Sequence, residues 1–215
     1  MSEPRPRFVF TLLRHGESVG NAEARWQGQV DFPLNDMGRA QARALVKRWR
    51  SEGVTFERVF ASPLLRARET AEIVAAGLGG LPIAFETDLM ERAIGDYSGL
   101  TGEEVRQFGR PDFTTPYDAV GGHGEGDWEL FLRAGRVLHW LLRQPVGKYL
   151  VVSHGGLLNQ FMHAVTGIAP HANDGGPRFR FGNTAFSRLV YIPSQHRWDI
   201  ETHNDHTHWK GVAPY

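Results

Sequence analysis

The chain has 215 residues, of which 41% are hydrophobic and 22% are charged, proportions that are ordinary for a soluble globular protein. Lys+Arg and Asp+Glu both number 24, so the basic excess that marks nucleic-acid-binding proteins is missing and we expect no nucleic-acid partner. There is no cysteine, which excludes disulfides, thiolate metal sites and cysteine nucleophiles.

The N-terminal part of the chain contains only a short apolar run before Arg14. This run is too short for a signal peptide or a membrane span, so we expect a cytoplasmic protein without membrane contact. The same run, RFVFTLL, predicts a buried first strand because it is rich in β-forming residues.

Strand-like and helix-like segments alternate along the rest of the chain. Asn35 and Thr101 are suited to cap the helices that follow them, and Gly53 to end one. We predict strands at 7–13, 58–62, 82–86 and 148–154, helices at 34–53, 62–79, 101–109, 127–144 and 155–167, and a closing hairpin from 184–192 and 197–202. Residues 110–126 are predicted to be loop because they are rich in Pro, Gly and Asp.

This alternation predicts an α/β fold, a three-layer α/β/α sandwich around a mainly parallel sheet. We expect one domain over residues 1–215, with a lid-like insertion at about 87–126. Neither an internal repeat nor an interdomain linker interrupts the pattern.

Polar residues follow three of the predicted strands: Arg14 with His15, the segment from Ser62 to Arg66, and His154. Ligands of such sheets bind just beyond the carboxyl ends of the strands, so we expect these groups to share one edge. A lone His or Arg near a strand end is more often structural, but three such segments together favour a site.

Two guanidinium groups offer planar forks of donors that match phosphate oxygens, and two arginines would repel each other without a dianion between them. Gly155, which follows His154 at the start of a predicted helix, would let a backbone amide approach that anion. A phosphoryl group therefore fits this edge best. No Asp-rich or His-x-His spacing lies near either histidine, so we expect no metal and no other cofactor.

Five segments in this order resemble the successive signatures of the histidine phosphatase superfamily: LLRHGES, PLNDMGRAQA, SPLLRARETA, ERAIGDYSGL and VVSHGG. This family contains cofactor-dependent phosphoglycerate mutases and many small phosphatases. The resemblance covers residues 8–160, with a weaker one in NDHTH near the end, and it implies a phosphoglycerate mutase-like fold.

The resemblance implies a catalytic role for five residues. His15 would be the nucleophile that accepts a phosphoryl group, and Arg14, Arg66 and His154 would bind the phosphoryl oxygens. Glu91 would protonate the leaving oxygen and later deprotonate the attacking water. By composition alone the acid would be open to three competitors, Asp88, Glu103 and Glu104.

The resemblance also implies residues that bind the substrate. Asn21 matches a position that donates to phosphate, and Gln27 with Gly28 matches a contact on the substrate side. Arg92, directly after the acid, is a feature of the mutases.

Other positions favour a phosphatase over a mutase. The segment LTGEE after Gly99 lacks the lysine that mutases carry there, and the segment 110–126 holds a single arginine, Arg110, where mutases have a basic pair. We therefore expect a hydrolase of small phosphomonoesters, with broad specificity as one option. The alternatives are a cofactor-dependent phosphoglycerate mutase and, from another class, a non-catalytic phospho-ligand binding module.

Several features stay open at this stage. Four residues would either line a leaving-group pocket or pack the insertion: Trp26, Phe113, Tyr117 and His123. A histidine-rich tail would either bind metal or pack near the active-site edge: His203, His206 and His208.

The partner is expected to be a small phosphate ester; the oligomeric state is open, with a homodimer as one option. Gly126 stands where the family carries a small hydroxyl residue, and this difference leaves the role of its loop open.

Overall fold

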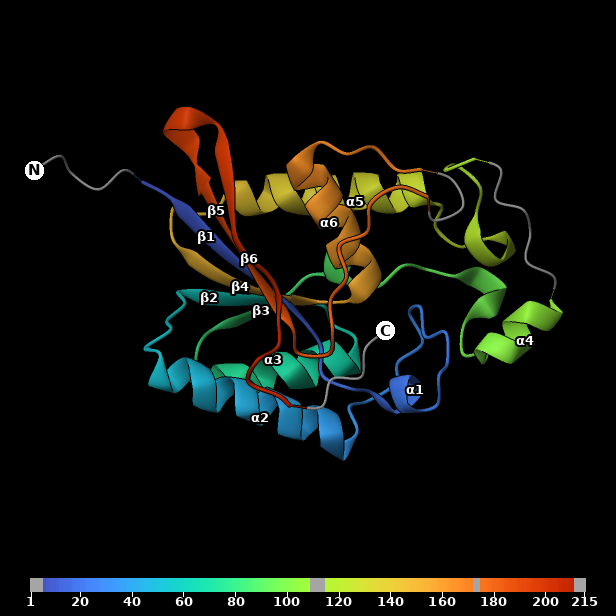
Figure 1. Cartoon of the computed structure of the whole chain (residues 1–215), viewed down its shortest axis with the longest axis horizontal. Helices are drawn as coiled ribbons and strands as arrows, with labels where there is room; N and C mark the ends of the chain where they lie inside the picture. The colour runs from blue at the N-terminus through green and yellow to red at the C-terminus, as the bar shows by residue number, and fades with distance from the viewer. Residues whose placement is uncertain (1–5, 109–114, 172–174, 211–215) are drawn as a thin grey trace, which may run out of the picture.

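The computed structural model describes residues 6–108, 115–171 and 175–210. Within them, six strands form one sheet in the order β3-β2-β4-β1-β5-β6 (Figure 1). The strands are β1 (Phe8–Arg14), β2 (Arg58–Ala61), β3 (Ile83–Phe85), β4 (Lys148–Ser153), β5 (Phe186–Ile192) and β6 (Arg197–Asp205). The first four pair in parallel, whereas β5 runs antiparallel to both β1 and β6.

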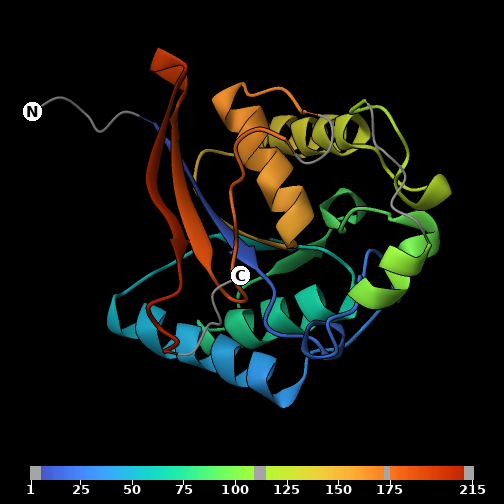
Figure 2. The same ribbon diagram turned by 45° about the vertical axis from the view of Figure 1, so that its right-hand side comes forward.

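Helices cover both faces of this sheet (Figures 1 and 2). The α-helices of the described residues are α1 (Val19–Ala22), α2 (Asp36–Ser51), α3 (Leu65–Gly77), α4 (Gly102–Gln107), α5 (Asp127–Leu142) and α6 (Gly155–Thr166). Helices α2 and α3 lie on one face and α5 and α6 on the other, while α1 and α4 lie to one side. The predicted three-layer α/β/α sandwich with a mainly parallel sheet is confirmed.

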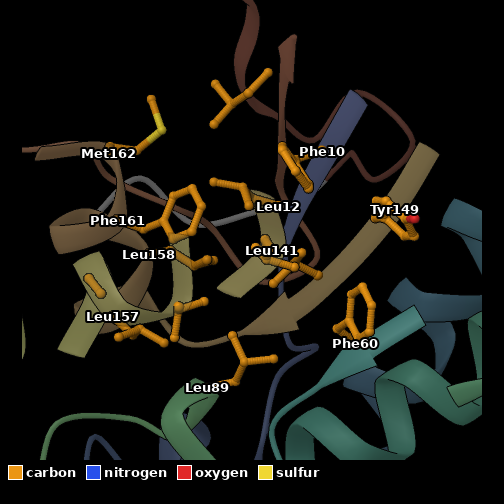
Figure 3. Close-up of a cluster of buried hydrophobic side chains, with 14 of the residues drawn as sticks. Phe10, Leu12, Phe60, Leu89, Leu141, Tyr149, Leu157, Leu158, Phe161 and Met162 are labelled. Carbon is orange, nitrogen blue, oxygen red and sulfur yellow. The ribbon is translucent and has the colours of Figure 1, made fainter. Parts of the chain in front are cut away.

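The core follows from the alternation of side chains along the central strands. In β1, Phe10 and Leu12 face α5 and α6, and Leu13 faces α2 and α3; in β4, Val151 and Val152 divide in the same way. Figure 3 shows the first of these clusters, where Leu12 lies near Phe161 and Leu158 of α6. Two buried layers therefore hold the central strands, and with them the strand ends, in place.

The predicted elements are found with small shifts at their ends. Asn35 caps α2 by accepting a hydrogen bond from the amide of Gly38, and Thr101 forms a capping box with Glu104 at α4. Helix α3 begins at Leu65, after Pro63, because its cap is the extended residue Leu64. Strand β6 extends beyond the prediction to Asp205.

Three short turns of helix inside the expected irregular part were not predicted: η1 (Thr87–Leu89), η2 (Gly95–Tyr97) and η3 (Val120–Gly122). Nor was α1, which begins with a capping box between Ser18 and Asn21. A small cluster of buried side chains holds the described part of 87–126: Ile94, Tyr97, Val105 and Val120. The segment 109–114, with Arg110 and Phe113, lies outside the described residues.

Across the described ranges, no helix combines the length and the apolar character needed to cross a lipid bilayer.

Candidate active site

The strands carry the predicted polar groups to one edge. β2, β4 and β1 are parallel neighbours, so their carboxyl ends lie together. The backbone hydrogen bonds between β1 and β4 continue one residue past β1, since the amide of His15 donates to the carbonyl of Ser153 at 3.0 Å. The imidazole rings of His15 and His154 have centroids 5.1 Å apart, and Nε of Arg66 lies 3.2 Å from Nδ1 of His154. Residues more than 80 positions apart in the chain thus meet at this edge.

His15 is held in one orientation and one tautomer. Its side chain is nearly fully buried, and Nδ1 lies 2.7 Å from the carbonyl oxygen of Gly16. Because a carbonyl can only accept, Nδ1 carries the proton and Nε2 keeps its lone pair. Among the described residues, Nε2 takes part in no hydrogen bond. Burial, and then the charges of Arg66 and Arg14, hold the pKa of His15 well below its ordinary value of 6.5, so the ring is neutral at pH 7.

Both ring nitrogens of His154 are engaged within the protein. Nδ1 accepts from Arg66, so the proton of the neutral ring sits on Nε2, which donates to Oγ of Ser62 at 2.8 Å. Burial and the charge of Arg66 lower the pKa of this histidine well below 6.5. To donate to a phosphoryl oxygen, Nε2–H of His154 would therefore have to share or give up its hydrogen bond to Ser62.

Two arginines converge on this pair of rings. Arg66 is almost completely buried and donates to the carbonyls of Gly28 at 2.7 Å and Val30 at 2.9 Å. Burial lowers its pKa to about 10, which leaves it cationic at neutral pH. Arg14 donates to the carbonyl of Phe181 at 2.7 Å and is near enough for its charge to lower the pKa of Arg66 as well. Such a concentration of positive charge suits an anion.

Glu91 lies at the N-terminus of α6. Its carboxylate accepts from the amides of Gly156 at 3.1 Å, Leu157 at 3.2 Å and Arg92 at 2.9 Å. Gly156 makes this approach feasible, because a Cβ there would lie 2.5 Å from Oε1 of Glu91. The helix N-terminus thus fixes the direction of the carboxylate.

The three competing acids are placed elsewhere. Glu103 pairs with Arg106 on α4, Glu104 caps the same helix, and Asp88 faces Arg136. None of the three lines the cavity beside Glu91.

A cavity of 800 Å³ opens beside these groups. Six of the ten predicted site residues line it: Arg14, Gln27, Gly28, Glu91, Arg92 and Gly155. The other four do not: His15, Asn21, Arg66 and His154. The volume falls in the range of sites for small organic ligands, roughly 300–1,000 Å³, and leaves ample room for a leaving group beyond a phosphoryl group.

The side chains predicted to bind the substrate already form some contacts within the protein. Oδ1 of Asn21 accepts from the backbone amide of Ser18 at 3.1 Å and from the side chain of Asn183 at 3.3 Å, and Oε1 of Gln27 accepts from the hydroxyl of Ser18 at 2.7 Å. The amide NH₂ groups of both side chains therefore remain as the donors. Arg92 forms an ion pair with Asp127.

Gly28 has a left-handed φ of +49° and packs against Ile94, where a Cβ would come within 2.5 Å. Glycine is required there for both reasons.

Sequence reasoning missed much of the far wall of the cavity. The segment 175–181, which has no helix or strand, contributes Arg178, Phe179, Arg180 and Phe181. Helix α6 adds Asn159, Gln160 and His163. The alternation of basic and aromatic residues in RFRF was the one signal that could have pointed to this wall.

Of the aromatic and histidine residues expected either to line a leaving-group pocket or to pack the insertion, one lines the cavity and two do not. Trp26 lines the cavity and packs edge-to-face on Tyr97. Tyr117 is exposed and packs on Trp128 outside the wall, and His123 is exposed beside Asp96.

The tail histidines form separate contacts. His203 lies 2.8 Å from Oγ of Ser187, and His208 lies 2.9 Å from Oγ1 of Thr184. Within the part of the chain that the structure describes, no cluster of three or more metal-ligating side chains is present. The amide of Thr184 donates to the carbonyl of His15 at 3.2 Å, so His208 contacts a residue that is itself bound to the candidate site.

Comparisons with known proteins point to one family. The model of the "Histidine phosphatase superfamily (branch 1)" matches residues 10–206. A "Probable phosphoglycerate mutase GpmB" from Photorhabdus laumondii is 37% identical over 92% of this chain and 93% of its own.

Two solved structures have the same fold. YhfR of Bacillus stearothermophilus has a TM-score of 0.82 and 29% identity, covering 94% of this chain and 98% of its own. A mycobacterial glucosyl-3-phosphoglycerate phosphatase in complex with VO3 has a TM-score of 0.74 and 27% identity, covering 94% and 99%.

Proposed function

Because the chain belongs to the histidine phosphatase superfamily, we propose that it hydrolyses small phosphate monoesters through a phosphohistidine formed on His15. The observation that carries this proposal is the state of that ring. It is neutral and buried, its Nδ1 proton is held by the carbonyl of Gly16, and two guanidinium groups lie nearby. A lone pair beside concentrated positive charge is what attack on a phosphate dianion requires.

The reaction then has two steps. Nε2 of His15 attacks phosphorus, the bond to the ester oxygen breaks, and Glu91 gives its proton to the leaving oxygen. Glu91 next takes a proton from water, the water oxygen attacks phosphorus, and the bond to Nε2 breaks. Arg14 and Arg66 neutralise the phosphoryl oxygens throughout, so the proposal needs no metal. Inorganic phosphate leaves, and the ring returns to its first tautomer.

Water is the proposed acceptor of the phosphoryl group. Support comes from the phosphatase among the solved structures of similar fold and from the absence of the mutase basic residues in the sequence. The alternative is a mutase, which the names of the sequence relatives favour. Arg178 and Arg180 in the cavity wall supply positive charge that sequence reasoning did not count, so the choice calls for a direct test.

The substrate is proposed to be a small phosphorylated metabolite that enters the cavity with its phosphoryl group toward His15. We further propose that residues 1–215 act as one domain and that the segment 87–126 serves as its lid. The described part of that segment contributes Tyr97, Val105 and Val120 to the cavity wall, in keeping with such a role.

The nucleophile can be tested with p-nitrophenyl phosphate in the presence of EDTA. We expect His15→Ala to lower kcat/KM by roughly 10³-fold or more and to abolish the phosphorylated protein seen by mass spectrometry after an acid-free quench. His139→Ala, which removes an exposed histidine on α5, is the matched control. Equal rates for wild type and His15→Ala would refute the proposal.

The acceptor can be tested with 3-phosphoglycerate and 2,3-bisphosphoglycerate supplied together. We expect release of inorganic phosphate and little isomerisation. Rapid formation of 2-phosphoglycerate with little free phosphate would establish the mutase instead.

A further inference from the structure

Arg133 on α5 is a buried arginine whose five N–H donors are all used. Nε and Nη2 donate to the two carboxylate oxygens of Glu125, at 2.7 and 2.5 Å. Nη1 donates to the carbonyls of Asp88 at 2.8 Å and Met90 at 2.6 Å, and Nη2 also reaches the carbonyl of Glu91 at 3.1 Å. Only a planar guanidinium provides donors in this number and geometry.

These bonds hold the backbone of the proposed acid on both sides. The carbonyls of Met90 and Glu91 are bound by Arg133 itself, and the amide of Ala93 donates to Oε2 of Glu125 at 2.9 Å. Residues 90–94 belong to no helix or strand, so no regular backbone pairing holds this segment. The side chains of Arg133 and Glu125 provide most of its hydrogen bonds instead, together with the side chain of Gln29 and the backbone amide of Glu125.

The carboxylate of Glu91 is held from a second helix. The amides of Gly156 and Leu157 at the start of α6 bind its oxygens. Helices α5 and α6 pack together through Leu130, Ala134, Leu158 and other buried side chains of one cluster. Arg133 of α5 thus binds the backbone of Glu91, whose carbonyl also accepts from Gln29 at 2.9 Å. The start of α6 binds the carboxylate, and α5 and α6 form one packed unit.

We propose that Arg133 and Glu125 are positioning residues for proton transfer: they hold the peptide of Glu91 so that its carboxyl group meets the leaving oxygen. Neither residue lines the cavity, so they act through Glu91 rather than on the substrate. The inference rests on the proposed function, in which Glu91 is the acid. It also assigns a role to the loop that carries Gly126, since Glu125, the residue before it, completes the clamp.

Substrates whose leaving groups differ in basicity distinguish a loss of proton transfer from a general loss of activity. p-Nitrophenolate departs without protonation, whereas the alkoxide of glycerol 2-phosphate needs a proton. kcat/KM reports only steps up to departure of the leaving group, so later hydrolysis of the phosphohistidine does not enter. We expect Arg133→Lys and Glu125→Gln each to lower kcat/KM for glycerol 2-phosphate about 10- to 100-fold and that for p-nitrophenyl phosphate less than about threefold.

Two further variants frame this comparison. Glu91→Gln should show the same selective loss, and Arg136→Ala, the exposed neighbour on α5 whose ion pair with Asp88 lies at the surface, should show none. Suppose that Glu91→Gln is selective, but that Arg133→Lys and Glu125→Gln lose activity equally with both esters or with neither. That result would overturn the inference and leave the proposed function standing. Wild-type turnover that does not depend on His15 would instead overturn the proposed function.

Amide hydrogen exchange provides a readout that does not depend on activity. Residues 90–94 should exchange faster in Arg133→Lys and in Glu125→Gln than in wild type, with no change in Arg136→Ala. Unchanged exchange in both clamp variants would remove the clamp, whatever the kinetics. Because the two variants alter opposite ends of one contact, a folding failure in one still leaves the other to decide.

Discussion

Gly155 and Gly156 stand side by side at the start of α6, but a side chain would meet different surroundings at each. At Gly156 a Cβ would lie 2.5 Å from Oε1 of Glu91, whereas at Gly155 its nearest contact would be Nε of Arg14 at 3.7 Å. The first distance forces the carboxylate away, and the second is an ordinary van der Waals contact.

We therefore expect Gly156→Ala to lower kcat/KM for an alkyl phosphate roughly 10- to 100-fold, because Glu91, the proposed proton donor, is moved from its place. Gly155→Ala should cost clearly less, since nothing has to shift around the added methyl group. Steady-state kinetics on both variants, with thermal melts to show that both are folded, checks this. Equal losses would mean that room for Glu91 is not what Gly156 provides.

The ionisation of His15 can be observed directly. Its pKa lies well below 6.5 because the ring is buried and because Arg66 and Arg14 add positive charge nearby. A base with a lowered pKa stays neutral as the pH falls through 6.5, so the proposed nucleophile persists into mildly acidic solution.

Nitrogen-15 NMR of the labelled imidazole should show His15 neutral, with its proton on Nδ1, at pH values where an unperturbed histidine is half protonated. Arg14→Met removes one of the charges and should raise the pKa toward 6.5. A wild-type ring that takes up its proton near pH 6.5 would contradict this account.

Two glycines allow α2 to approach the loop that carries His15. A Cβ on Gly16 would lie 2.6 Å from the carbonyl oxygen of Gly38, and a Cβ on Gly38 would lie 2.1 Å from that of Glu17. Both obstacles are backbone atoms, which cannot rotate away. The start of α2 and the loop that carries His15 are thus packed main chain against main chain, a contact that any side chain would separate.

Gly38→Ala should accordingly destabilise the protein by about 1–3 kcal/mol, despite the better helix propensity of alanine. Gly135 lies inside α5 with nothing within 4 Å of its added Cβ, and Gly135→Ala should stabilise by roughly 0.5–1 kcal/mol. Urea denaturation measures both changes. If Gly38→Ala were as stable as wild type, the close approach of α2 would not matter for the fold.

Buried histidines link the stability of the entire fold to pH. The pKa values of His15 and His154 are lowered chiefly by burial, and that of His208 is lowered to about 4 by burial and the charge of Arg48. Each depressed pKa means that the unfolded chain binds a proton, near pH 6.5, that the folded chain does not. The stability that these groups contribute is present above 6.5 and is lost as the pH falls.

We expect the free energy of unfolding to decrease as the pH falls below 6.5, by about 1.4 kcal/mol per pH unit for each proton taken up on unfolding. Asp205, whose pKa is lowered mainly by its hydrogen bond to Arg48, adds a further loss only in more acidic solution. Urea denaturation at a series of pH values tests this. His208→Asn should flatten the dependence between pH 6.5 and 4; an unchanged slope would show that His208 is not one of the groups responsible.

Local patterns were sufficient for most of the architecture. Strands such as β1 and β4 alternate between two buried layers, and helices such as α2 begin at a residue that caps them, so each was predictable from neighbouring residues. Helix α1 was missed because its four residues provide no hydrophobic period. The family motifs pointed to Glu91 among four acids, and the described structure places only that one in the cavity wall.

The amino-acid sequence by itself determined the fold class, the family and the edge of the sheet where the polar groups gather, because parallel strands place their carboxyl ends together. The tertiary structure alone decided which nitrogen of each histidine carries a proton, where the carboxylate of Glu91 is held, and that Arg133 clamps its backbone. Those features depend on hydrogen bonds and burial between segments that are distant in the chain, such as the contact of Arg66 with His154, and no local pattern encodes such geometry.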